Sequence, residues 1–187
     1  MPNTNIINVT RMDAARRQLQ AALTLWFADG DAVSIHSLVG SAYQVLHDLN
    51  RKAKGPPLLF DSPLIKKEMS KEAVASLKAH LNFFKHADLR KGDGALDIDF
   101  DPALSELYFL ACLLGVEALG ESLNAHESAF MLWRQLHGPM GAVENSKKML
   151  SQQFSAEGIA ALRGLEKGEF IAHYLASRAT RRAAGLQ

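Results

Sequence analysis

The chain has 187 residues, of which 48% are hydrophobic and 22% are charged, and its formal net charge at pH 7 is +1. These values exclude a disordered or fibrous chain, and so small a net charge excludes attraction of nucleic acid by a general positive field. A chain of this length can bury about two thirds of its unfolded surface, so we expect one domain over residues 1–187 with a packed core.

Cysteine content and apolar runs indicate the compartment. The single cysteine, Cys112, rules out an intrachain disulfide and is typical of a reducing compartment. Residues 1–9 lack the charged start and apolar stretch of a secretory signal, and we expect them to be flexible. The longest apolar run, 107–116, is shorter than the roughly 20 residues that cross a bilayer. We therefore expect a cytoplasmic protein with no membrane contact.

Apolar residues recur at helical spacing through the first half of the chain. They predict three helices, with approximate bounds 11–27, 32–54 and 70 to 86–88. Thr10 with Asp13 is typical of a capping pair before the first helix, and Asp31 is expected to cap the second. The stretch 58–65 carries a proline and no helical period, so it is expected to be an ordered apolar connection packed on the helices.

A different pattern follows the third helix. Leu96, Ile98 and Phe100 alternate with three aspartates. Strict alternation is typical of an extended segment with one buried face. We therefore expect a short β segment near residues 96–100, for which residues 58–60 could supply a partner.

The second half of the chain again has helical spacing. Asp101-Pro102 is expected to open an apolar helix from 103 to about 119, and Asn124 opens a fifth helix that ends before Gly138. Two or three shorter helices follow. Their expected bounds are 142–153, 155–166 and 169–183, with Ser155 as a cap and Gly168 as a separator. The predicted fold is an all-α, single-domain helical bundle of about six to seven helices, with a basic end at 178–187.

Four polar side chains of different chemistry lie close together at the end of the third helix: Asn82, Lys85, His86 and Asp88. Helical spacing places Asn82 and His86 about 40° apart around the axis, so both can point into one cleft with Lys85. An amide, an ammonium group and an imidazole suit an anionic ligand. The alternative is that Lys85 and His86 only complement the negative end of the helix dipole, and that Asp88 fixes the turn.

A second polar stripe lies on the second helix. His36, Gly40, Tyr43 and His47 follow spacings of four, three and four. A glycine inside a helix costs about 1 kcal/mol relative to alanine, so a close approach by another helix or by a ligand would explain Gly40. His36 and Tyr43 are therefore candidate ligand-binding residues. The alternative is that both are partly buried and hydrogen-bonded beside a tight helix crossing.

Motifs for metal or cofactor binding are absent from the sequence or incomplete. The pair His47-Asp48 resembles the His-Asp dyad of metal-dependent HD phosphohydrolases, but His36 lies about 16 Å away along the same helix and cannot share a metal ion with His47. The aspartate-rich run 97–101 lacks the glycine and the glutamate of an EF-hand loop. The sequence contains no glycine-rich phosphate loop, nucleophile elbow or paired cysteines. It thus predicts no metal and no cofactor.

From residue 31 to about 119, with Val33-Ser34-Ile35-His36 and the motif 82–88, the chain resembles a family of small bacterial all-helical proteins of unknown function. The ending Asn82-x-x-Lys85-His86 also resembles HEPN domains. That resemblance implies a groove that cleaves RNA or binds nucleotides, a homodimer, and His86 as the candidate catalytic acid or base. HEPN ribonucleases carry an arginine shortly before this histidine, and the chain has none there, which favours binding over cleavage.

The sequence thus favours a helical binding module for a nucleotide, RNA or another anionic ligand near the end of the third helix. One alternative is a structural or regulatory module for a protein partner, bound through Met131, Trp133, Met140 and Met149. A less favoured alternative is a metal-dependent hydrolase that uses His47 and Asp48.

Overall fold

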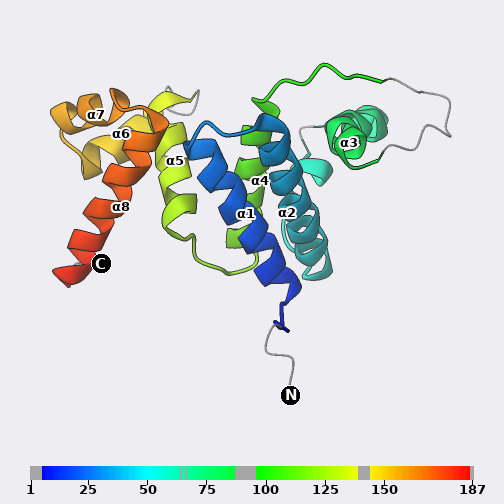
Figure 1. The fold of residues 1–187 in the computed structure, drawn as a ribbon, viewed down its shortest axis with the longest axis horizontal. Coiled ribbons are helices and arrows are strands. Elements are labelled where there is room, and N and C mark those ends of the chain that lie inside the picture. Colours follow the sequence, from blue (N-terminus) through cyan, green and yellow to red (C-terminus); the bar gives the residue numbers. More distant parts are fainter. Residues whose placement is uncertain (1–5, 64, 66, 87–95, 139–143, 186–187) are drawn as a thin grey trace. The chain divides into compact units, whose positions relative to one another are not determined.

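The computed structural model describes residues 6–63, 65, 67–86, 96–138 and 144–185, and over these residues the chain is all helical (Figure 1). Eight α-helices and two short 3-10 helices are present in this described part. In chain order they are α1 (Arg11–Phe27), α2 (Ala32–Lys52), η1 (Leu59–Asp61), η2 (Lys67–Met69), α3 (Ser70–Lys85), α4 (Leu104–Ala118), α5 (Ala125–His137), α6 (Glu144–Gln153), α7 (Ala156–Arg163) and α8 (Lys167–Ala183).

The chain divides into two compact units. The first comprises residues 1–22 and 31–122, and the second comprises 23–30 and 123–187. Helix α1 therefore contributes its first three turns to the first unit and its last residues to the second. The single domain expected from the sequence stays a prediction.

Helices α2 and α4 form the centre of the first unit. Asp31 caps α2 by accepting a hydrogen bond from the Ser34 backbone N–H at 2.7 Å, as predicted. Cys112 of α4 is buried, with its Sγ 3.7 Å from the Val39 carbonyl oxygen, and so serves as a core residue. A Cβ atom at Gly115 would lie 3.4 Å from the Leu46 Cβ, so this glycine lets the two helices approach closely.

Helix α3 is seen nearly end-on in Figure 1, where α2 runs lengthwise, so the two helices cross steeply. At the crossing Gly40 faces Leu81, whose side chain occupies the space that a Cβ atom at Gly40 would need. Tyr108 of α4 also holds α3 by donating its hydroxyl hydrogen to the Leu77 carbonyl at 2.7 Å. The close approach predicted at Gly40 is confirmed, and another helix makes it.

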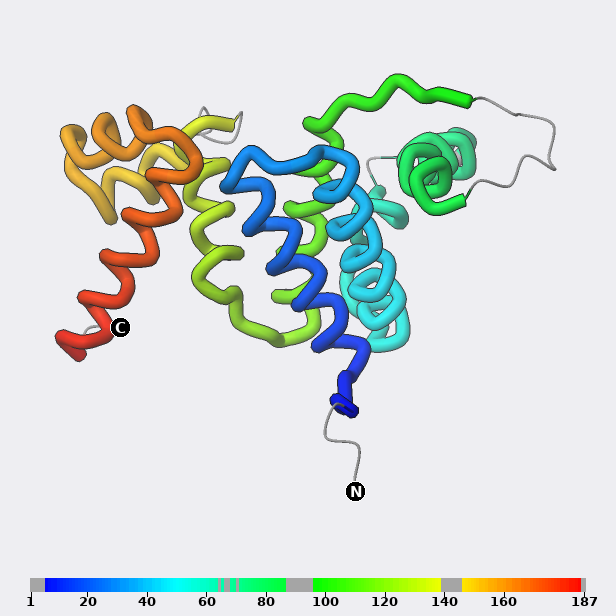
Figure 2. The backbone as a smooth tube through the Cα atoms, viewed as in Figure 1, coloured from blue at the N-terminus to red at the C-terminus, as the bar shows by residue number. Residues whose placement is uncertain are grey.

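The β segment expected near residues 96–100 is wrong: no strand occurs among the described residues. Of the candidate partner 58–60, Leu59 and Phe60 belong to the 3-10 turn η1, which cannot form a strand ladder. The Asp99 carbonyl instead accepts a hydrogen bond from the His80 ring at 2.9 Å. Figure 2 shows residues 96–103 running toward α4 on the side of the unit where α3 lies. The alternation corresponds to the half-burial of Ile98 and Phe100, and the Phe100 ring contacts His36 of α2 and Phe84 of α3.

The second unit is built around packed aromatic rings. Trp26 contacts Phe130 with ring centroids 5.0 Å apart, and Phe27 stacks on Phe170 at 6.3 Å. Arg163 of α7 donates to the Leu136 carbonyl of α5 at 3.1 Å. The predicted capping box at Asn124 is confirmed and opens α5.

Helix bounds differ from the predicted ones at three places. The described part holds eight α-helices, not six to seven, because each of the three segments considered after residue 142 forms a separate helix. Ser155 caps α7 as predicted, but Gly164 ends it, and Gly168 lies inside α8. Helix α4 begins at Leu104 because the Asp101 carboxylate accepts the Ala103 N–H at 2.9 Å and delays the first helical turn.

Candidate functional site

Three of the predicted site residues lie exposed at the end of α3. Asn82 and Lys85 are on its last turn, and His86 is the first residue beyond it, with an extended backbone. The His86 N–H donates to the Asn82 carbonyl at 3.0 Å and closes the helix. Leu81 takes the inward position on this turn, which leaves the polar side chains facing solvent. Asp88 lies outside the described residues.

The other two predicted site residues, His36 and Tyr43, are completely buried. The Tyr43 hydroxyl accepts a hydrogen bond from the Phe60 backbone N–H at 3.0 Å. Burial raises the pKa of this hydroxyl well above its ordinary value, so it stays protonated. Tyr43 thus holds η1 against α2 and forms part of the core.

His36 lies in a box of rings beneath the exposed end of α3. Its Nδ1 is 3.1 Å from the Ser105 Oγ, and its ring centroid is 4.8 Å from that of Phe100 and 5.3 Å from that of Tyr108. The Nε2 atom is buried and has no hydrogen-bond partner within the described residues. A buried polar atom without a hydrogen-bond partner is unusual in a folded protein, so the surroundings of this nitrogen are a candidate functional site.

His36 is electrically coupled to two other basic groups. Burial lowers its pKa to about 4, and the positive charges of His80 and Lys85 contribute to the decrease. The ring of His80 lies 6.2 Å from that of His36, between centroids. His36, His80 and Lys85 therefore form what we call the basic cluster, in which a proton on His36 is disfavoured.

His80 was not among the residues that the sequence predicted. Its Nε2 contacts the Asp99 carbonyl, while its Nδ1 is buried with no partner in the described part of the chain. The signal that could have found it is its position one helical turn before Phe84, on the inner side of the predicted third helix. Two imidazoles thus each present one nitrogen without a partner.

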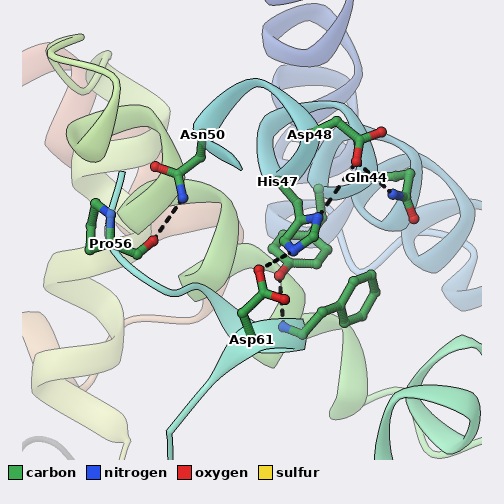
Figure 3. Close-up of polar contacts among 8 residues, drawn as sticks. Gln44, His47, Asp48, Asn50, Pro56 and Asp61 are labelled. Carbon is green, nitrogen blue, oxygen red and sulfur yellow. Dashed lines mark hydrogen bonds and ion pairs between the residues drawn. The ribbon is translucent and has the colours of Figure 1, made fainter. Parts of the chain in front are cut away.

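A second histidine, His47, helps to hold residues 56–61 against α2 (Figure 3). The His47 Nε2 is 2.6 Å from the Asp61 Oδ2, and its Nδ1 is 3.6 Å from the Asp48 Oδ1. Asn50 donates from its side chain to the Pro56 carbonyl at 2.7 Å. These contacts, together with the Tyr43 hydroxyl, fix residues 56–61 along α2.

The Asp61 partner bears on the metal-dependent hydrolase alternative. Across the described residues no group of three or more histidine, cysteine or acidic side chains could hold a metal ion. The His47 Nε2 is engaged by Asp61 at 2.6 Å, and Asp48 lies 3.6 Å from the other ring nitrogen. The arrangement therefore fits a structural contact between η1 and α2 better than an open metal-binding site.

Comparison of the chain with protein-family models, with curated proteins and with solved structures gives no match. The likeness of residues 31 to about 119 to the small bacterial family, and that of the motif at the end of α3 to the HEPN class, therefore remain resemblances. No helix in the described part is long and apolar enough to cross a membrane.

Proposed function

We propose that the end of α3 binds an anionic ligand, a nucleotide or an RNA phosphate, and that the chain acts as a binding module. Lys85 and His86 are the expected contacts to the phosphate oxygens, with Asn82 contacting a neighbouring polar group. Ammonium and imidazole groups form charge-assisted hydrogen bonds to phosphate that are stronger than those between neutral groups.

The observation that carries the proposal is the basic cluster, which has no acidic ion-pair partner among the described residues. Within the described residues, no acidic side chain forms an ion pair with Lys85, whereas the ion pairs present elsewhere join lysine, arginine or histidine to aspartate or glutamate. Burial lowers the pKa of His36, and repulsion from its basic neighbours His80 and Lys85 lowers it further. A bound anion would offset this repulsion and supply the missing negative charge.

Binding is proposed rather than cleavage because one part of the HEPN pattern is missing. The motif Asn82, Lys85 and His86 supports a phosphate contact, but the preceding turn contains no arginine. If cleavage does occur, the exposed His86 is the candidate general acid or base. The homodimer that the resemblance implies is part of this proposal.

A second candidate function is binding of a protein partner, and one observation favours it. Leu107 and Leu114 stand two helical turns apart on α4 and are 39% and 57% exposed. Of the residues first proposed for this role, Met149 is 48% exposed and Met140 lies outside the described residues. Trp133 packs on Phe170 in the second unit, with ring centroids 5.1 Å apart.

A thermal-shift assay with adenosine monophosphate, a short single-stranded RNA and inorganic phosphate tests the proposal. Ligands that bind only the folded state raise its melting temperature. Lys85→Gln and His86→Ala should each reduce the shift, because each removes one charge-assisted contact and weakens binding by about tenfold. Lys71→Gln is the matched control, since Lys71 is exposed on the first turn of the same helix.

Each outcome decides between the candidates. A shift that Lys85→Gln reduces and Lys71→Gln keeps would support a site at the end of α3. Equal shifts in both variants would contradict it. No shift with any probe would favour the second candidate function, binding of a protein partner through Leu107 and Leu114 of α4. Leu114→Glu should then abolish self-association or binding of the partner.

A further inference from the structure

The second unit contains a hollow between α5, α7 and α8 with a volume of about 360 Å³. Its wall is largely apolar, and the residues that form it come from these three helices and from the turns before and after α7. They are Leu132, Phe154, Gly158, Ala161, Leu162, Leu165, His173, Tyr174, Ser177, Arg178 and Arg181. A hollow of this size lies at the small end of the range for pockets that bind small molecules.

Helix α8 supplies the polar side of this hollow. His173, Ser177 and Arg181 follow one another at intervals of four residues, so they lie on one face of the helix. Arg178 and Tyr174 line both this hollow and a wider one of about 900 Å³ along the end of α8. The arginines therefore stand at the mouth where the apolar hollow opens.

The described charged side chains at this site are basic. Among the described residues that line the two hollows there is no aspartate or glutamate, and Arg178 and Arg181 are both exposed. Basic residues near the end of a helix also complement its dipole, which would account for the arginines alone. The dipole does not account for the apolar wall that Leu132, Phe154 and Leu162 form beside them.

We infer that the second unit binds a small amphipathic carboxylic acid, with its apolar chain in the 360 Å³ hollow and its carboxylate on Arg178 and Arg181. A guanidinium group matches a carboxylate with two parallel hydrogen bonds, and an apolar wall favours burial of the chain. This site lies in the other unit from the anion site proposed at α3, and neither proposal depends on the other.

Isothermal titration calorimetry of the full chain with decanoate, below the concentration at which it forms micelles, tests the inference. 1-Decanol has the chain without the charge, and acetate has the charge without the chain. Decanoate should bind at least tenfold more tightly than either, because both parts of the site are needed.

Two variants separate the site from a general effect of charge. Arg178→Gln with Arg181→Gln should weaken decanoate binding at least tenfold. Arg182→Gln is the matched control, since Arg182 lines only the wider hollow. It should leave the affinity within about twofold. Ala161→Trp should block the hollow and abolish binding while the circular dichroism spectrum stays unchanged.

Three results would overturn the inference. Absence of decanoate binding would remove the site. Equal binding of decanoate and 1-decanol, unchanged in the double arginine variant, would show an apolar surface without head-group recognition. Tighter binding of decyl phosphate than of decanoate would replace the carboxylate by a phosphate as the recognised group.

Discussion

His36 is the residue whose environment matters most to this account. It is fully buried, is hydrogen-bonded through only one nitrogen within the described residues, and lies near the basic side chains of His80 and Lys85. An imidazole in such a place is kept neutral by the core and by its basic neighbours. Its state of charge therefore links the stability of the first unit to pH and to any anion bound nearby.

The first prediction concerns the pH dependence of stability. The pKa of His36 is 6.5 in an unfolded chain and about 4 in the folded one, so the unfolded state binds more protons between these values. The free energy of unfolding should therefore fall as the pH is lowered from 6.5 to 4, by about 3 kcal/mol from this residue.

Urea denaturation of wild type and His36→Phe between pH 4 and 7 measures this effect. The variant should lose most of the slope, since a phenyl ring fits an aromatic box and takes up no proton. Burial also lowers the pKa of His126, which leaves a smaller slope of the same sign. Parallel curves for the two proteins would mean that His36 does not control the pH dependence.

At the scale of elements, the crossing of α2 and α3 positions the proposed site. Gly40 on α2 admits the Leu81 side chain, and this contact sets the distance between the last turn of α3 and His36. Tyr108 reinforces the crossing through the Leu77 carbonyl. A change at the crossing should therefore affect both the stability of the unit and the anion site.

Gly40→Ala tests the crossing. A Cβ atom there would lie 2.9 Å from the Leu81 Cγ, and closer still to the ends of that side chain. Overpacking should destabilise the protein by roughly 1–3 kcal/mol, more than the gain of about 1 kcal/mol in helix propensity. Chemical denaturation gives the difference in unfolding free energy.

A double variant and a control make this result specific. In Gly40→Ala with Leu81→Ala the clash is removed, so the combined cost should be smaller than the sum of the single costs. Gly158→Ala on α7 is the control, because its Cβ would have its nearest neighbour 3.4 Å away. Strict additivity of the first two substitutions would show that these residues do not share one contact.

Local sequence signals predicted the helices and their caps more successfully than they predicted the tertiary contacts between helices. The caps at Asp31, Asn124 and Ser155 were found because each needs only a side chain and the backbone a few residues on. The segment near Phe100 was wrongly predicted to be a strand. Alternating apolar and polar residues indicate that one face of a segment is buried, but not which element buries it. Here the cover is the ring of His36, 64 residues away in the chain.

The candidate site was only partly accessible from the sequence for the same reason. Asn82, Lys85 and His86 could be grouped because they lie on one helical turn. The stripe of His36 and Tyr43 on α2 was also found, yet its burial depends on α4 and on residues 58–61, which periodicity cannot place. His80 was missed because only the tertiary fold brings it to His36.

At the scale of the whole molecule, the two sites that we propose for anionic ligands belong to different compact units. The basic cluster with the end of α3 belongs to the first unit, and the arginine-lined hollow belongs to the second. The net charge of +1 gives no general attraction for anions, so each site must act through local geometry. Salt should accordingly weaken binding only modestly.

Titration of adenosine monophosphate, followed by the imidazole nitrogen signals of the histidines in nuclear magnetic resonance, tests the central claim most directly. The account predicts that the signals of His80 and His86 shift, that the pKa of His36 rises, and that Lys85→Gln weakens both effects. Unchanged signals for these three histidines at saturating ligand, or a shift confined to His173 in the second unit, would contradict a phosphate site at the end of α3.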